Sequence, residues 1–148
     1  MKIAIGCDHG GFELKNLIAA HLKERGFEVT DFGITENRPV DYPEIALKVA
    51  SSVAAGENKL GILVCGTGIG MSLAANKVKG IRAAACSDYY SAKYTRLHND
   101  ANILCLGGRV VGAGTALELA DLFVDTEFEG GRHQRRVDMI SEIENSQK

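Results

Sequence analysis

Short apolar runs alternate with amphipathic segments along the whole chain. The apolar runs predict strands over residues 2–7, 27–32, 60–65, 81–86 and 103–106, the first of them buried. Apolar residues at helical spacing predict helices over residues 12–25, 43–56, 88–97, 113–124 and 132–144, with another helix beginning near residue 70. Strands that alternate with helices form right-handed βαβ units in a parallel sheet. The pattern therefore predicts an α/β fold in which helices cover both faces of a five-stranded parallel sheet.

Composition places the chain among ordinary globular proteins and argues against several kinds of partner. Its 148 residues suit one domain spanning residues 1–148, and the net charge of −2 gives no footprint for nucleic acid. No apolar stretch approaches the roughly 20 residues of a membrane span, and the opening KIAIGCD is not a signal peptide. The 4 cysteines form no C-x-x-C pair. We therefore expect a cytoplasmic protein with reduced, buried thiols at Cys7, Cys65, Cys86 and Cys105.

Ligands bind beyond the carboxyl ends of the strands in sheets of this kind. The segments expected to project there are residues 8–11, 33–35, 66–70, 87–88 and 107–109. Several of these segments are rich in glycine, which lets the backbone approach a ligand closely. The binding site is therefore expected at this edge of the sheet.

The segment LVCGTGIGMS, residues 63–72, joins a predicted strand to a predicted helix. The backbone N–H groups of such a turn suit an anion: a phosphate, a pyrophosphate, or a charge that develops during a reaction. A dinucleotide-binding fingerprint would need a third glycine where Met71 stands, and no G-K-[ST] follows for a P-loop. We therefore favour an oxyanion or phosphate site over a dinucleotide site.

Cys65 ends its predicted strand immediately before these N–H groups. A nearby helix terminus favours the thiolate, which is the reactive form of cysteine. The alternative is that Cys65 is only a small buried hydrophobe. No aspartate, glutamate or histidine lies between residues 60 and 75 to serve as a base instead, and the pattern by itself leaves both interpretations open.

Asp8, His9 and His98 are the other polar side chains that need an explanation. Asp8 and His9 follow the first predicted strand, where Asp8 suits either a helix N-cap or a ligand contact. His98 follows a helix rather than a strand, so it should lie at the opposite edge of the sheet. It is either a cation favoured by the helix dipole or a catalytic residue that serves the crevice of another subunit.

Arg132 and Arg136 fall within the apolar arc of the last predicted helix when its residues are placed at 100° intervals. We therefore expect both to face protein, where they need a counter-ion, and a phosphate suits two arginines four residues apart. Histidine, cysteine, aspartate and glutamate show no metal-ligand spacing, so no metal is assigned.

Four motifs, CDHGGFELK, CGTGIGMSLAANK, HNDANILCLGGRVVG and EGGRHQRR, together resemble the family of type B ribose-5-phosphate isomerases and galactose-6-phosphate isomerase subunits. The resemblance covers nearly the whole chain. It implies a Rossmann-like three-layer α/β/α sandwich and a homodimer with its sites at the subunit interface. It also implies interconversion of ribose 5-phosphate and ribulose 5-phosphate without metal or cofactor. The same chemistry on allose or galactose 6-phosphate, and a non-catalytic phosphosugar sensor, remain alternatives.

The resemblance also implies roles for individual residues. Cys65 matches the family's base and His98 its ring-opening acid, while Thr67 could relay protons between the substrate oxygens. The anion-binding loop corresponds to Gly66, Thr67, Gly68, Ile69 and Gly70. The substrate-contacting positions correspond to Asp8, His9, Asn99, Arg109, Arg132 and Arg136. One branch of the family has a glutamate where this chain has Met71, so this chain resembles the branch that uses cysteine.

Overall fold

The computed structural model describes residues 1–147 and contains a five-stranded sheet in the order β2-β1-β3-β5-β4. All neighbouring strands pair in parallel. The strands are β1 (Lys2–Cys7), β2 (Glu28–Asp31), β3 (Leu60–Cys65), β4 (Ala83–Ala85) and β5 (Ile103–Gly107). The predicted parallel sheet is therefore confirmed, although the edge strands β2 and β4 are shorter than their apolar runs.

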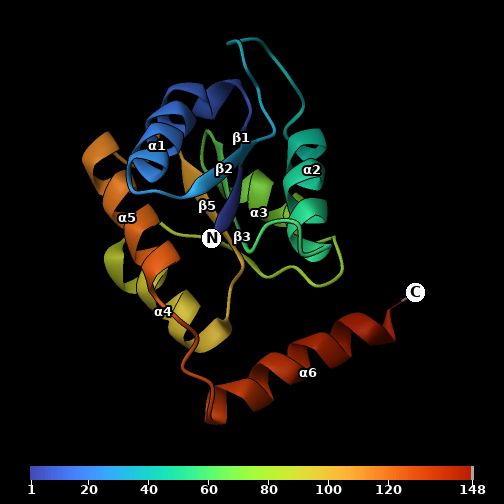
Figure 1. The fold of residues 1–148 in the computed structure, drawn as a ribbon. Helices are drawn as coiled ribbons and strands as arrows, with labels where there is room; N and C mark the ends of the chain where they lie inside the picture. The colour runs from blue at the N-terminus through green and yellow to red at the C-terminus, as the bar shows by residue number, and fades with distance from the viewer. Residues whose placement is uncertain (148) are drawn as a thin grey trace.

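Helices cover both faces of this sheet, as the alternating pattern predicts (Figure 1). One layer contains α1 (Phe12–Glu24), α4 (Tyr89–Asn99) and α5 (Ala113–Asp125), and the other contains α2 (Tyr42–Ala54) and α3 (Ile69–Ala75). A short 3-10 helix, η1 (His9–Gly11), precedes α1. The result is the expected three-layer α/β/α sandwich with a Rossmann-like arrangement.

The central strand β3 is buried along its whole length, because β1 and β5 flank it and helices cover both of its faces. All six of its residues are buried. A parallel strand covered on both faces has no solvent-facing side, which explains its continuous apolar sequence LGILVC. The carboxyl end of β3 is therefore held firmly by its neighbours at the edge of the sheet.

The C-terminal helix α6 (Arg132–Ser146) leaves the sandwich and contacts α4 near its own first turns (Figure 1). Met139, Ile140 and Ile143 on α6 are 49%, 48% and 64% exposed. Arg132 and Arg136 are exposed as well. The prediction that these arginines face protein is thus wrong within one chain, because the chain itself does not cover the apolar side of α6.

None of the helices formed by residues 1–147 combines the length and the apolar character that crossing a membrane requires.

Candidate active site

Cys65 lies at the carboxyl end of β3 and is 5% exposed. Its Sγ accepts a hydrogen bond from the backbone N–H of Gly68 at 3.1 Å. A backbone N–H directed at sulfur stabilises negative charge on that atom. The turn after β3 therefore holds the thiol in an environment that suits a base, in addition to packing it.

The loop after β3 keeps its shape because glycine occupies the position that needs a left-handed backbone. Gly68 has φ 81°, and a Cβ there would lie 3.0 Å from the carbonyl carbon of Leu106. The neighbouring Thr67 side chain is exposed, and its Oγ1 accepts a hydrogen bond from the N–H of Ile69 at 3.2 Å. The exposed Thr67 side chain therefore lies on the loop two residues after Cys65, bonded to the loop's own backbone.

The segment after β5 packs directly against this loop. The N–H of Gly108 donates to the carbonyl oxygen of Cys65 at 2.7 Å, and the N–H of Arg109 donates to that of Gly66 at 3.0 Å. A Cβ on Gly107 would lie 2.8 Å from the backbone of Thr67, so only glycine allows this approach. These contacts bring the Arg109 side chain to the loop that follows Cys65.

Asp8 and His9 reach the same edge of the sheet from the end of β1. The Asp8 side chain is 8% exposed, and its Oδ1 accepts a hydrogen bond from the N–H of Gly10 at 2.8 Å. This bond confirms the N-cap interpretation of Asp8. His9 is exposed, and together with Arg109 it lines a depression of about 180 Å³. Glu13 lines the same depression, so an anionic group is suited to the side formed by His9 and Arg109.

A second cluster surrounds His98 in the last turn of α4. Its ring stacks on that of His133, with centroids 3.9 Å apart and an angle of 11° between the planes. Its Nε2 lies 3.7 Å from Oε2 of Glu129, and the Tyr94 ring meets it edge-on with centroids 4.9 Å apart. Asn99 follows in sequence and lines, with His98 and Tyr94, a depression of about 360 Å³.

His133 was missed by the sequence reasoning, although it lies directly after Arg132. Its side chain is buried, and its Nε2 has no hydrogen-bond partner among residues 1–147. Burial lowers the pKa of His133, and positive charge on His98 and Arg132 lowers it further. The neutral form of His133 is therefore favoured where its ring stacks on that of His98.

His98, Glu129 and His133 form a cluster that no sequence motif predicts. One imidazole nitrogen from each histidine and one carboxylate oxygen of Glu129 lie within 4.8 Å of one another. An imidazole binds a metal through a lone pair in the plane of its ring. The stacked planes of His98 and His133 do not direct their lone pairs at a common point. The cluster fits a pair of interacting histidines better than a metal centre.

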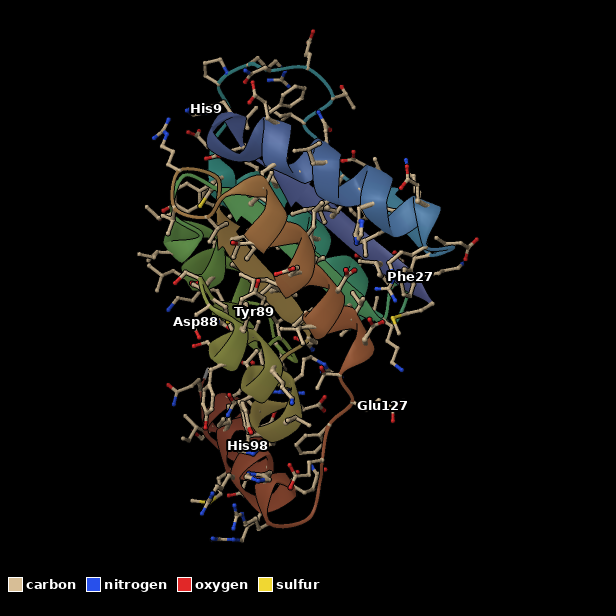
Figure 2. All side chains as sticks on the ribbon, turned by 90° about the vertical axis from the view of Figure 1, so that its left-hand side faces the viewer. His9, Phe27, Asp88, Tyr89, His98 and Glu127 are labelled. Carbon is tan, nitrogen blue, oxygen red and sulfur yellow. The ribbon has the colours of Figure 1, made fainter. Side chains whose placement is uncertain are left out.

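The predicted site residues thus fall into two groups. Figure 2 shows His9 and His98 at opposite ends of the molecule. The first group, at the carboxyl edge of the sheet, contains Asp8, His9, Cys65, the loop Gly66–Gly70 and Arg109. The second group, where α4 ends and α6 begins, contains His98, Asn99, Arg132 and Arg136. One chain brings the members of each group together but separates the two groups.

Comparison of the sequence with known proteins shows the family to which the chain belongs. A sequence model of the family described as Ribose/Galactose Isomerase matches residues 3–140. The chain belongs to this family. It is 54% identical over 143 residues to ribose-5-phosphate isomerase B of Escherichia coli (strain K12), covering 97% of this chain and 96% of that protein. The resemblance found in the four sequence motifs is therefore confirmed.

Solved structures of the ribose/galactose isomerase family have the same fold. Ribose-5-phosphate isomerase B of Clostridium thermocellum is 58% identical, with a TM-score of 0.96 and 98% of both chains covered. The enzyme of Mycoplasma genitalium, solved with bound ribulose-5-phosphate, is 44% identical with a TM-score of 0.95, covering 99% of this chain and 97% of that one.

The other cysteines of this family member differ from Cys65 in their surroundings. Burial raises the pKa of Cys7 and of Cys86 to about 11, and it raises the pKa of Cys105 well above its usual range. All 4 thiols are free and buried. At neutral pH these three thiols stay protonated, so their packing role is confirmed and Cys65 remains the candidate for chemistry.

Proposed function

We propose that this protein is an aldose–ketose isomerase that interconverts D-ribose 5-phosphate and D-ribulose 5-phosphate. The observation that carries the proposal is the Cys65 thiol at the end of β3, with the N–H of Gly68 directed at its sulfur. A base beside backbone donors is what proton transfer next to a carbonyl group requires. The relative from Mycoplasma genitalium, which was solved with ribulose-5-phosphate, supports the choice of sugar.

Cys65 is proposed to move one proton between the two carbons that distinguish the sugars. The thiolate takes the proton from C2 of the open-chain aldose, and the resulting thiol returns a proton at C1 to give the ketose. The intermediate is an enediolate, whose negative oxygen needs donors already in place. The N–H groups of Gly66–Gly70 are proposed to supply them, and Thr67 to pass a proton between the two oxygens.

Ring opening must come first, because ribose 5-phosphate exists mostly as a closed ring. His98 is proposed to give a proton to the ring oxygen while a base, for which Asp8 is suited, takes the proton of the C1 hydroxyl. The contact of His98 Nε2 with Glu129 at 3.7 Å and the stacked His133 ring hold the imidazole in place for this step.

A homodimer is proposed to unite the two groups of residues. In a two-fold symmetric dimer the same surfaces meet twice, so the carboxyl edge of one sheet can face the His98 cluster of the partner and the reverse. The exposed apolar residues Met139, Ile140 and Ile143 on α6 supply a surface that a second copy would cover. Each dimer would then contain two sites, and each site would use both chains.

The phosphate of the substrate is assigned to the arginines of α6. Arg132 and Arg136 are exposed in one chain and lie one helical turn apart, so both can reach the same group. His9 and Arg109 of the facing protomer are proposed to complete this site. With Asn99 contacting the sugar, these groups hold the substrate in place and leave the proton transfers to Cys65 and His98.

The family description includes both ribose and galactose, so the number of carbons in the substrate, five or six, needs a test of its own. The ratio of kcat/KM for ribose 5-phosphate to that for allose or galactose 6-phosphate decides between them. A non-catalytic phosphosugar sensor would instead bind tightly and show no turnover. The 4 free cysteines suit a reducing compartment, and we assign the protein to the cytoplasm.

The experiment that tests the proposal is an isomerase assay in EDTA with wild type, Cys65→Ala and Cys86→Ala. Loss of the base should lower kcat for Cys65→Ala by about 10²–10⁴-fold while the variant still binds ribose 5-phosphate. Cys86→Ala removes a buried thiol that stays protonated and has no proposed role in proton transfer, although it lines the depression beside His98, so the variant should keep most of its activity. Turnover by Cys65→Ala at the wild-type rate would refute the role of the thiol.

A further inference from the structure

We propose that Asp100 is a positioning residue that fixes the turn carrying His98 and Asn99. The inference rests on the proposed ring-opening role of His98. It starts from an unusual backbone: Asp100 has φ 46° and ψ 43°, and it is the one non-glycine residue with positive φ among those the structure describes. Its N–H donates to the carbonyl oxygen of Thr95 and ends α4.

Two arginines satisfy the backbone carbonyl groups at this helix end, which have no partner within the helix. Arg82 Nε donates to the carbonyl oxygens of Asn99 and Asp100, each at 3.0 Å. Its Nη2 donates to the same carbonyl oxygen of Asp100 at 2.8 Å. Arg96 donates to the carbonyl oxygen of Ala101 at 2.6 Å. The turn is therefore held by Arg82, which directly precedes β4, and by Arg96 in α4 itself.

The Asp100 carboxylate orients both guanidinium groups. Its Oδ1 accepts a hydrogen bond from Arg96 at 2.9 Å, and its Oδ2 accepts one from Arg82 at 3.3 Å. Arg96 is 6% exposed and lies over the Phe123 ring, so it requires a counter-ion where it is. Removing the carboxylate would leave each guanidinium group with its backbone carbonyl acceptors alone and without the charge that orients it.

The same turn also holds the segment that leads into α6. Arg96 Nε donates to the carbonyl oxygen of Thr126 at 3.1 Å, and the N–H of Glu129 donates to that of Leu97 at 3.0 Å. This segment brings Glu129 to His98 and leads on to His133. Asp100 therefore acts on His98 from two sides, through the end of α4 and through the start of α6.

Asp121 offers a matched control elsewhere in the fold. Its Oδ1 accepts hydrogen bonds from His21 and Arg25, both at 2.8 Å, between α1 and α5. Its side chain is 34% exposed, compared with 36% for Asp100. Both aspartates thus bridge two basic side chains at similar exposure, but Asp121 contacts none of the proposed site residues.

The test compares two reactions of the intact protein. The first is net conversion of ribose 5-phosphate, which needs ring opening. The second is exchange of the C1 hydrogens of ribulose 5-phosphate with D₂O, followed by NMR. That sugar has no free C5 hydroxyl with which to close a furanose ring, so exchange needs the proton transfer but no ring opening.

Asp100→Gly keeps the left-handed turn and removes the carboxylate, whereas Asp100→Asn also keeps one acceptor oxygen. We expect Asp100→Gly to lower conversion by about 10- to 100-fold, which is what misplacing a catalytic group costs. Exchange at saturating ribulose 5-phosphate should change by less than about threefold, because saturation removes the effect of weaker binding by Asn99, Arg132 or Arg136. Asp100→Asn should be intermediate in conversion. His98→Ala provides the reference for selective loss of ring opening, and Asp121→Asn should leave both reactions unchanged.

Equal losses in conversion and exchange would overturn the positioning role, because a general loss of folded protein lowers both alike. Full conversion by both Asp100 variants would also overturn it, as would the same selective loss in Asp121→Asn. If Asp100→Gly does not fold, the same comparison is made with Asp100→Asn: a lower ratio of conversion to exchange than in wild type supports the positioning role, and an unchanged ratio overturns it. Wild-type protein that neither converts nor exchanges would refute the proposed function itself, a result distinct from all of these.

Discussion

A dimer assembled from one Cys65→Ala chain and one His98→Ala chain should be active, although each variant alone should be inactive. Cys65 is aligned with Gly107, the last residue of β5, at the carboxyl edge of the sheet. His98 precedes Ile103, the first residue of β5, in the chain. The four residue steps from Ile103 to Gly107 span about 13 Å at 3.3 Å per residue, which is longer than a five-carbon sugar phosphate. One chain therefore does not bring both groups to the same substrate.

The size of the recovery follows from the symmetry of the proposed dimer. In a mixed dimer, one site combines both substituted residues and the other combines both intact ones. A purified mixed dimer should therefore have about half the wild-type activity, and a random equal mixture of chains about a quarter. Co-expression of the two variants with different affinity tags yields the mixed dimer for assay with ribose 5-phosphate.

The result that refutes this reasoning is an inactive mixed dimer. If Cys65 and His98 served one site from the same chain, each site of the mixed dimer would lack one of them. A mixed dimer of Cys65→Ala with Cys65→Ala carrying the other tag is the matched control, and it should remain inactive.

Three further outcomes are expected. Iodoacetamide at pH 8 should modify native protein at Cys65 alone. The pKa values of about 11 leave roughly one in a thousand of the Cys7 and Cys86 thiols ionised, and burial raises the pKa of Cys105 well above its usual range. A single adduct in intact mass spectrometry, prevented by substrate, checks this. The lowered pKa of His133 means that the unfolded chain takes up a proton which the folded chain resists, so stability should fall as pH drops through about 6.5. Urea unfolding at pH 7.5 and 5.5 should show a weaker pH dependence for His133→Asn than for wild type. Ile143→Asp should dissociate the proposed dimer and abolish activity, and unchanged mass in light scattering would contradict the assignment of this α6 surface.

The central strands could be predicted from the sequence because a strand buried on both faces must be apolar throughout. The run from Leu60 to Cys65 shows this directly. The alternation of strands with amphipathic helices predicted the parallel sheet. The position of Cys65 before a glycine-rich turn was also local information, since strand, turn and glycine spacing are read within ten residues. The match between the end of this strand and the segment at Gly107 follows from the parallel order of the sheet.

The environment of His98 was decided only by the tertiary structure. His133 and Glu129 reach it from more than thirty positions away through the path of the segment between α5 and α6, which no local periodicity encodes. The prediction that Arg132 and Arg136 face protein was wrong within one chain for a related reason. An apolar arc on a helix reports that a surface is buried somewhere, but it does not identify the chain that buries it. In this protein the sequence determined the sheet and the thiol at its edge, whereas the tertiary structure decided which residues surround His98 and which helix surface is left for a second copy.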